Sequence, residues 1–168
     1  MGRVNKVADV KDLLRRSIDD LQLALPDVKT LAASDDWGER EVAATLLVET
    51  GKRKPNEVVG AMAAWASDPD ANVRRCASEG LRGIARKTPD IVFPVLTKLN
   101  ADSSLYVKKS VANVLRNAGN YHPEKVFDLC REWASEGNKN TQWIINDGLR
   151  KLKIKYPDEV EAILASPE

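Results

Sequence analysis

Basic and aromatic side chains recur in this sequence at intervals of 34 residues. Three such series are Glu41, Arg75, Lys109 and Trp143; Thr45, Glu79, Asn113 and Asp147; and Val48, Arg82, Arg116 and Arg150. If each series shares one face of the molecule, its cations form a stripe suited to phosphate contacts. The alternative is the ordinary solvated face of charged helices. The spacing thus raises the question of an anionic partner.

The positive charge is concentrated in the middle of the chain. Residues 70–120 contain nine Lys and Arg against four Asp and Glu, whereas residues 1–69 contain ten against twelve and residues 121–168 seven against nine. The formal net charge of +1 therefore hides a basic centre between two acidic flanks. Because the cations of this centre are also stacked in register, we favour a real anionic partner.

Several kinds of catalytic site are not visible in the sequence. The two cysteines, Cys76 and Cys130, form no CxxC pair and lie in helical patterns, where a Cys is usually a small buried hydrophobe. A single histidine, His122, leaves too few ligands for a zinc site. We also find no Gly-rich phosphate loop and no Ser/Cys–His set. The sequence therefore predicts no metal and no cofactor.

A ladder of prolines indicates which elements hold these side chains. Pro55, Pro89, Pro123 and Pro157 stand 34 residues apart, and a valine follows each of them three residues later. Proline is favoured at the first helical position because its missing N–H would have no partner there. A repeat of this length is typical of stacked helix pairs, which share a core that one pair cannot bury alone. Each proline is therefore predicted to open a first helix.

The second helix of each pair keeps the same register. Leucines recur in it at Leu47, Leu81, Leu115 and Leu149. The tetratricopeptide signature W-x₂-L-G-x₂-Y is absent, whereas an Asp followed by Val and basic residues, as in Asp70–Arg75, is typical of HEAT-like repeats. The predicted fold is an all-α, HEAT-like α-solenoid of about nine antiparallel helices in 34-residue helix-pair repeats. In such solenoids the three series line the concave surface.

We expect one domain over residues 1–168. An amphipathic pattern predicts one capping helix over residues 1–25, followed by repeats over residues 26–156 that begin with a short helix at Pro26, and by a last helix over residues 157–168. No run of 18 apolar residues is present, so we expect no membrane span. The N-terminus lacks the apolar centre of a signal peptide, and we therefore expect a cytoplasmic protein.

The four tryptophans divide into two pairs. Trp65 and Trp133 share one repeat position with Leu99 in the first helices, so they are predicted to be core residues. Trp143 shares a series with two cations, and Trp37 stands at the start of a second helix. Stacking on a sugar or a cationic base and packing at a helix end both remain open for this second pair.

Five motifs between about residues 30 and 156 have the same order as in one known family. They are Trp37–Arg40, Val73–Arg82, Tyr106–Asn113, His122-Pro123 and Trp143–Arg150. Together they resemble the HEAT-repeat DNA alkylation-repair glycosylases of the AlkC/AlkD type, and more closely the AlkC type. The resemblance implies a cradle for duplex DNA and the excision of purines alkylated at N3 or N7. Such bases are already cationic, so the protein's task is to stabilise an oxocarbenium-like sugar with a carboxylate.

The resemblance also implies roles for individual residues. Glu79 matches the glutamate of the family's Ser-Glu-Gly motif, and Asp147 stands where the family often carries His. The catalytic aspartate of the family follows Ser-Val-Ala-Asn by four residues, where this chain has the neutral Asn117. Glu79, Asn117 and Asp147 are thus the candidate catalytic residues, although Glu79 and Asp147 lie two repeats apart, roughly 20 Å. Trp37 and Trp143 are the candidate contacts to the lesion or its sugar.

The candidate DNA-binding residues are polar side chains of the second helices. They are Arg40, Arg74, Arg75, Arg82, Lys108, Lys109, Asn113, Arg116 and Arg150. Three functions stay open: a repair glycosylase, a DNA-binding relative without catalysis, and a scaffold for a protein partner. Asn117 favours the second over the first, and the basic centre favours both over the third. The sequence does not determine the oligomeric state.

Overall fold

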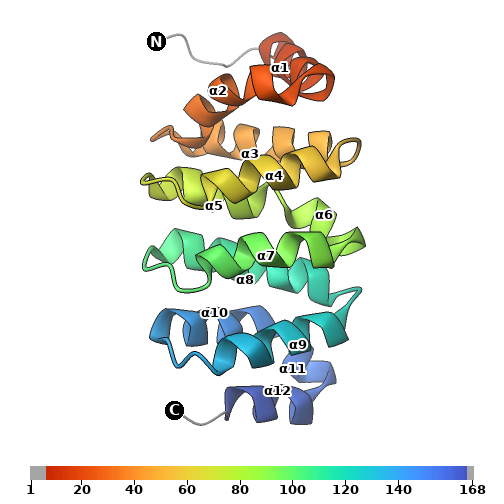
Figure 1. The fold of residues 1–168 in the computed structure, drawn as a ribbon, viewed down its shortest axis with the longest axis vertical. Coiled ribbons are helices and arrows are strands. Elements are labelled where there is room, and N and C mark those ends of the chain that lie inside the picture. Colours follow the sequence, from red (N-terminus) through yellow and green to blue (C-terminus); the bar gives the residue numbers. More distant parts are fainter. Residues whose placement is uncertain (1–6, 166–168) are drawn as a thin grey trace.

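Helices make up most of residues 7–165, the part of the chain that the computed structural model describes. The twelve segments in that range are α1 Val7–Asp19, α2 Leu21–Ala32, α3 Trp37–Gly51, α4 Pro55–Trp65, α5 Ala71–Glu79, α6 Arg82–Lys87, α7 Pro89–Leu99, α8 Leu105–Gly119, α9 Pro123–Ala134, α10 Lys139–Leu149, α11 Leu152–Lys155 and α12 Pro157–Leu164. They form one elongated stack from α1 to α12 (Figure 1). The expected all-α solenoid is confirmed.

Each proline of the ladder begins a helix, as predicted. Pro55, Pro89, Pro123 and Pro157 are the first residues of α4, α7, α9 and α12. The residue before each of them has nearly the same backbone geometry, with φ of −128° to −134° and ψ of 57° to 67°. A following proline disfavours the helical conformation in that residue, so the previous helix must end there.

Three of the second helices, α3, α5 and α10, begin with polar side-chain caps in place of prolines. The side chain of Asp70 accepts a 2.7 Å hydrogen bond from the Asn72 amide, and Asn138 accepts from the amides of Asn140 and Thr141. Asp36 caps α3 in the same way. These bonds satisfy amide groups that have no partner within the helix. The Asp and Asn residues of these turns therefore fix where the three helices start.

The number of segments exceeds the expected nine partly because two second helices are divided. α5 and α6 form one such helix, interrupted at Gly80 and Leu81, and α10 and α11 form another. At the first break the Leu81 amide donates to the Ser78 carbonyl at 2.9 Å, a bond that spans only three residues. A Cβ at Gly80 would lie 3.0 Å from Leu47 Cβ, so the break coincides with a close approach to α3.

The prediction for the N-terminal region was wrong. Where one helix over residues 1–25 was expected, α1 ends at Asp19 and α2 begins at Leu21. Asp20 separates them because its extended backbone and its side-chain bond to the Leu23 amide cap a new helix. Pro26 then lies inside α2 instead of opening a helix. Residues 1–6 of the expected cap, and residues 166–168 of the expected last helix, fall outside the described residues.

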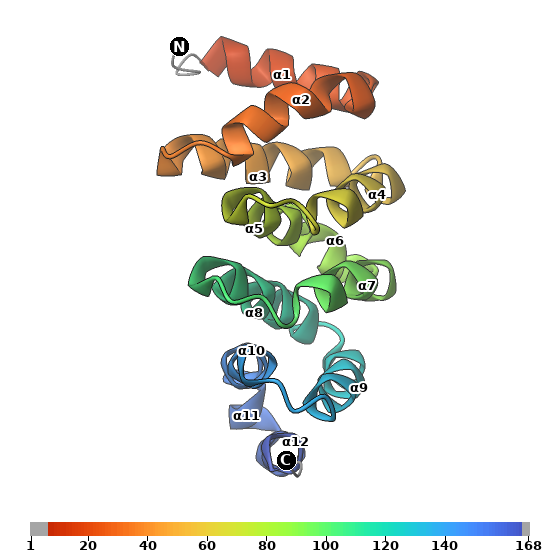
Figure 2. The same cartoon turned by 60° about the vertical axis from the view of Figure 1, so that its left-hand side comes forward.

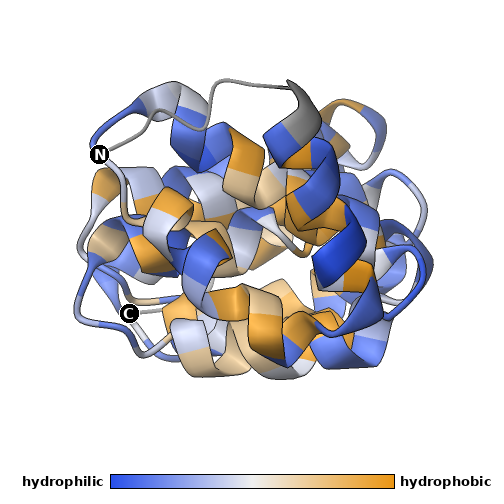
Figure 3. Ribbon diagram, turned by 90° about the horizontal axis from the view of Figure 1, so that it is seen from above, coloured by the Kyte–Doolittle hydropathy of each residue, from blue (hydrophilic) through white to orange (hydrophobic). Residues whose placement is uncertain are grey.

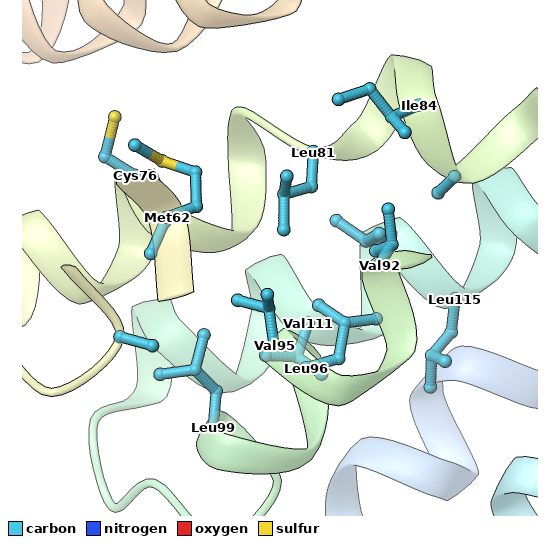
Figure 4. Packing of buried hydrophobic residues seen from close by; sticks show 14 of the residues in the cluster. Met62, Cys76, Leu81, Ile84, Val92, Val95, Leu96, Leu99, Val111 and Leu115 are labelled. Carbon is cyan, nitrogen blue, oxygen red and sulfur yellow. The ribbon is translucent and has the colours of Figure 1, made fainter. Parts of the chain in front are cut away.

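The core runs along the stack between two layers of helices. Figure 2 shows α4, α7 and α9 along one side and α5, α8 and α10 along the other. Seen from the end of the stack, the ribbon carries both hydrophobic and hydrophilic residues (Figure 3). In Figure 4 Val95 and Leu96 of α7 lie next to Val111 of α8. Trp65 and Trp133 are buried in this core, as predicted. None of the helices within residues 7–165 is long and apolar enough to cross a membrane.

Candidate nucleic-acid interface

The three series lie on the second helices, and equivalent positions in neighbouring repeats are adjacent. α5 contacts α3 and α8, and α8 contacts α10. Side-chain bonds confirm this register: Arg75 pairs with Glu41, which is 34 residues away, and Arg116 pairs with Asp147, 31 residues away. We call the surface that carries the three series the second-helix face. The repeat thus brings side chains together that are far apart in the sequence.

The first series forms an aromatic and charged cluster at its N-terminal end. Arg75 Nη2 lies 2.8 Å from Glu41 Oε1, and the Arg75 guanidinium carbon lies 4.7 Å from the centre of the Trp37 ring. Arg40 approaches the same ring at 5.7 Å. Trp37 nevertheless remains 56% exposed. The cations fix the orientation of this ring while leaving much of it open to a ligand.

The other candidate aromatic residue, Trp143, has different surroundings. It is half-buried and packs against the hydrophobic core, and the Lys108 ammonium lies 5.2 Å from its ring centre. Lys109 is exposed, with its ammonium 5.7 Å from the ring of Tyr106. Packing at a helix end therefore buries part of the Trp143 ring.

Each carboxylate of the second series is bound by an arginine of the third. Glu79 is only 6% exposed and pairs with Arg82 at 2.8 Å. Asp147 pairs with Arg116 at 3.1 Å and with Arg150 at 3.2 Å, and its backbone carbonyl accepts a further 2.9 Å bond from Arg116. Buried charges require such partners. The two candidate carboxylates therefore belong to separate arginine clusters in different repeats.

Asn117 takes part in a third arrangement. Its side-chain oxygen accepts a 2.8 Å bond from Arg86 Nε, and its amide nitrogen donates to the Asn113 carbonyl at 2.9 Å. A neutral amide serves both partners at once, since it has an acceptor and a donor. A carboxylate here would face the Asn113 carbonyl with an acceptor. The neutral residue thus suits its surroundings in this chain.

Three of the candidate DNA-binding cations connect turns and neighbouring repeats. Arg74 pairs with Asp102 at 2.8 Å and also donates to two backbone carbonyls of the preceding turn. The bond to Asp102 raises the pKa of Arg74 above its ordinary value. Arg40 donates to the Ser34 carbonyl, and Lys108 to the Asn140 side chain at 3.2 Å. These bonds hold the turns in place and leave fewer donors for a ligand.

One basic cluster, of which the sequence analysis selected only Arg82, lies where α3 ends and along α6. A hollow of about 700 Å³ is lined by residues from the ends of α3 and α6 and by Tyr121. Its cations are Lys52, Arg82, Arg86 and Lys87. A sequence signal for it exists, because basic residues precede both Pro55 and Pro89 at the same point of the repeat.

The two cysteine side chains are buried in the core. Burial raises the pKa of the Cys76 and Cys130 thiols to about 12, so both stay protonated near neutral pH. This confirms them as buried hydrophobes. Among residues 7–165 no group of three or more His, Cys, Asp or Glu is placed to hold a metal ion.

Comparison with known proteins places the chain in a family. The model of the DNA alkylation repair enzyme family matches residues 41–152. The uncharacterised protein YhaZ of Bacillus subtilis is 31% identical over 145 residues, which cover 81% of this chain and 40% of YhaZ.

Two solved structures share the fold. The Pseudomonas fluorescens alkylpurine DNA glycosylase AlkC, bound to DNA containing an abasic site analogue, matches with a TM-score of 0.75 and 29% identity over 92% of this chain and 44% of AlkC. AlkD2 from Streptococcus mutans, at 23% identity, matches with a TM-score of 0.71 over 84% of this chain and 70% of AlkD2, a likeness of fold. The chain thus spans less than half the length of YhaZ and AlkC. By its sequence match, the chain belongs to the DNA alkylation repair enzyme family.

Proposed function

We propose that this chain binds duplex DNA on the second-helix face as part of the repair of alkylation damage. Family membership and the likeness to a glycosylase solved on DNA support the proposal. The observation that carries it is the row of Arg82, Arg116 and Arg150, which occupies one position in three successive repeats. Cations repeated at roughly 10 Å along a stack match the extended, regular charge of a phosphate backbone.

The cations of this face differ in how readily they can turn to a phosphate. The Arg150 side chain is 61% exposed, so its pair with Asp147 is screened by solvent and costs little to exchange. Lys109 is exposed as well. By contrast, the Arg116 side chain is 13% exposed and donates to both the side chain and the carbonyl of Asp147. We assign Arg150 and Lys109 to direct phosphate contacts and Arg116 to holding Asp147.

Trp37 is the aromatic side chain best placed to meet a damaged nucleotide. Its ring is exposed and is held by Arg75, which in turn is paired with Glu41. An electron-rich ring attracts a cationic alkylpurine. Trp143 supports the interface mainly by packing, because much of its ring rests against the core.

Binding is tested with a fluorescently labelled duplex. The variant Lys109→Gln/Arg150→Gln is expected to bind about tenfold more weakly than the wild type, because two phosphate contacts are lost. Lys125→Gln removes one charge from α9, outside the three series, and serves as a control for the loss of positive charge elsewhere on the protein. Equal binding by all three proteins would contradict the proposed interface. A protein-interaction scaffold would bind none of the duplex.

Excision of N3- or N7-alkylpurines is the second candidate function. It is favoured by Glu79, a buried carboxylate at the position of the family's glutamate. Against it stand the neutral Asn117 and the arginines that bind both carboxylates. We expect weak or no release of 7-methylguanine from alkylated DNA. Release by the wild type that is lost in Glu79→Gln or Asp147→Asn would instead establish catalysis.

A further inference from the structure

The hollow between the ends of the second helices has the composition of a binding site. Its volume of about 700 Å³ falls in the size range of sites for small ligands. Apolar walls such as Ile84 stand beside four cations. In the described part of the chain, no carboxylate belongs to its lining. The site is therefore suited to a ligand with an anionic and an apolar part.

The positive charge of this hollow is only partly compensated. Arg82 pairs with Glu79 and Lys52 with Glu49, each at 2.8 Å. Arg86, in contrast, binds the neutral side chain of Asn117, which leaves its charge in place. Lys87 has no ion pair among residues 7–165. Two cations therefore remain to attract an anion.

An aromatic ring completes the hollow from the next repeat. Tyr121 is 64% exposed and lines the hollow. Its neighbour His122 places Nε2 2.9 Å from the Arg86 carbonyl, which ties the turn after α8 to the last turn of α6. The Tyr121 ring and the cations at the end of α6 are thus held on two connected segments. Stacking on an aromatic ring beside cations is the way proteins hold unpaired nucleotides.

We propose that this hollow binds one unpaired nucleotide of a DNA strand, with its phosphate at Arg86 and Lys87 and its base on Tyr121. The inference rests on the proposed function, because Arg82 belongs both to the hollow and to the row that carries the duplex. A strand that leaves the duplex near Arg82 enters the hollow directly. The second-helix face and the hollow then bind paired and unpaired DNA side by side.

The test compares a blunt duplex with the same duplex carrying a three-nucleotide single-stranded overhang. The wild type is expected to bind the overhang duplex about tenfold more tightly, from one base stacked on a ring. Tyr121→Leu keeps an apolar side chain but removes the ring, and should abolish that preference without changing blunt-duplex affinity. Lys87→Gln should reduce the preference, and Lys125→Gln should leave it intact.

Three outcomes would overturn the inference. If the wild type binds both duplexes with equal affinity, the hollow holds no unpaired nucleotide. If Tyr121→Leu weakens binding of both duplexes equally, the hollow is part of the surface that binds the duplex. Tight binding of free deoxyadenosine monophosphate without an overhang preference assigns the hollow to a free nucleotide. In all three cases the blunt duplex is still bound, whereas failure of the proposed function itself appears as loss of binding to both duplexes.

Discussion

Arg116 and Arg150 bind the same carboxylate of Asp147, yet they have different surroundings. Arg116 is nearly enclosed and makes two bonds to Asp147, while most of the Arg150 side chain is in solvent. The sequence placed both in one series and gave them one role. The sequence could not distinguish the two arginines, because their different exposure depends on how the side chains are oriented across the boundary between repeats. Two residues at the same position of the repeat can therefore have different roles.

This difference predicts distinct effects of two matched substitutions. Arg116→Gln should lower the free energy of unfolding by about 1–2 kcal/mol, because two charge-assisted bonds to Asp147 are lost. Arg150→Gln should change it by less than about 0.5 kcal/mol, since exposed pairs contribute little. Urea denaturation followed by circular dichroism measures both values. Equal losses in the two variants would contradict the assigned roles.

Asn117 gives a second prediction at this scale. In Asn117→Asp the new carboxylate should pair with Arg86 but lose the bond to the Asn113 carbonyl, so the free energy of unfolding should change by less than about 1 kcal/mol. With a carboxylate restored at the family's position, release of 7-methylguanine should rise above the wild-type level. The assay is release of the base from alkylated DNA, with Asn113→Asp as a control for added charge. No gain in Asn117→Asp would mean that the surrounding site cannot use the carboxylate.

At the scale of elements, the prolines and the polar turns determine the boundaries. Pro55, Pro89, Pro123 and Pro157 were found from spacing alone, because a missing N–H and a restricted preceding residue act locally. The end of α1 was missed, since the apolar pattern continues through Asp20 and gives no sign of the cap. The division between α5 and α6 was also missed, as it coincides with a contact to α3 that no local pattern records.

The break at Gly80 can be tested with a pair of glycines. A Cβ at Gly80 would lie 3.0 Å from Leu47 Cβ and 3.1 Å from the Cys76 carbonyl oxygen, whereas a Cβ at Gly60 in α4 meets nothing within 4 Å. We expect Gly80→Ala to destabilise the protein by about 1–3 kcal/mol and Gly60→Ala to stabilise it by about 0.5–1 kcal/mol. Thermal unfolding monitored by circular dichroism distinguishes the two. A stable Gly80→Ala variant would show that α3 and α5 are less closely packed.

At the scale of the whole molecule, one apolar core runs through the stack and contains both thiols. Burial raises the pKa of Cys76 and Cys130 from 9.0 to about 12, so the unfolded chain releases these protons at lower pH than the folded protein. The corresponding stability is fully present below pH 9 and is lost as the pH rises toward 12. The core thus makes the protein sensitive to alkali.

The raised thiol pKa values predict that the free energy of unfolding falls more steeply at alkaline pH in the wild type than in a variant without thiols. In Cys76→Ala/Cys130→Ala, the free energy of unfolding should be lower at neutral pH but should fall less between pH 9 and pH 11. Urea titrations at several pH values give both curves. Parallel curves would contradict the raised pKa values of the thiols.

The central claim for the whole molecule is that exposed cations of the second-helix face, Lys109 and Arg150 among them, bind the phosphates of duplex DNA. The basic centre and its register were visible in the sequence, whereas the partial pairing of the row with Glu79 and Asp147 was not. The most direct measurement is the dissociation constant of a labelled duplex as a function of salt. We predict a log–log slope of about −3 for the binding constant, from three to four phosphates, which moves toward zero by about two in Lys109→Gln/Arg150→Gln. Binding that does not change with salt, or a slope that is the same in this variant as in the wild type, would contradict the claim that these cations bind DNA phosphates.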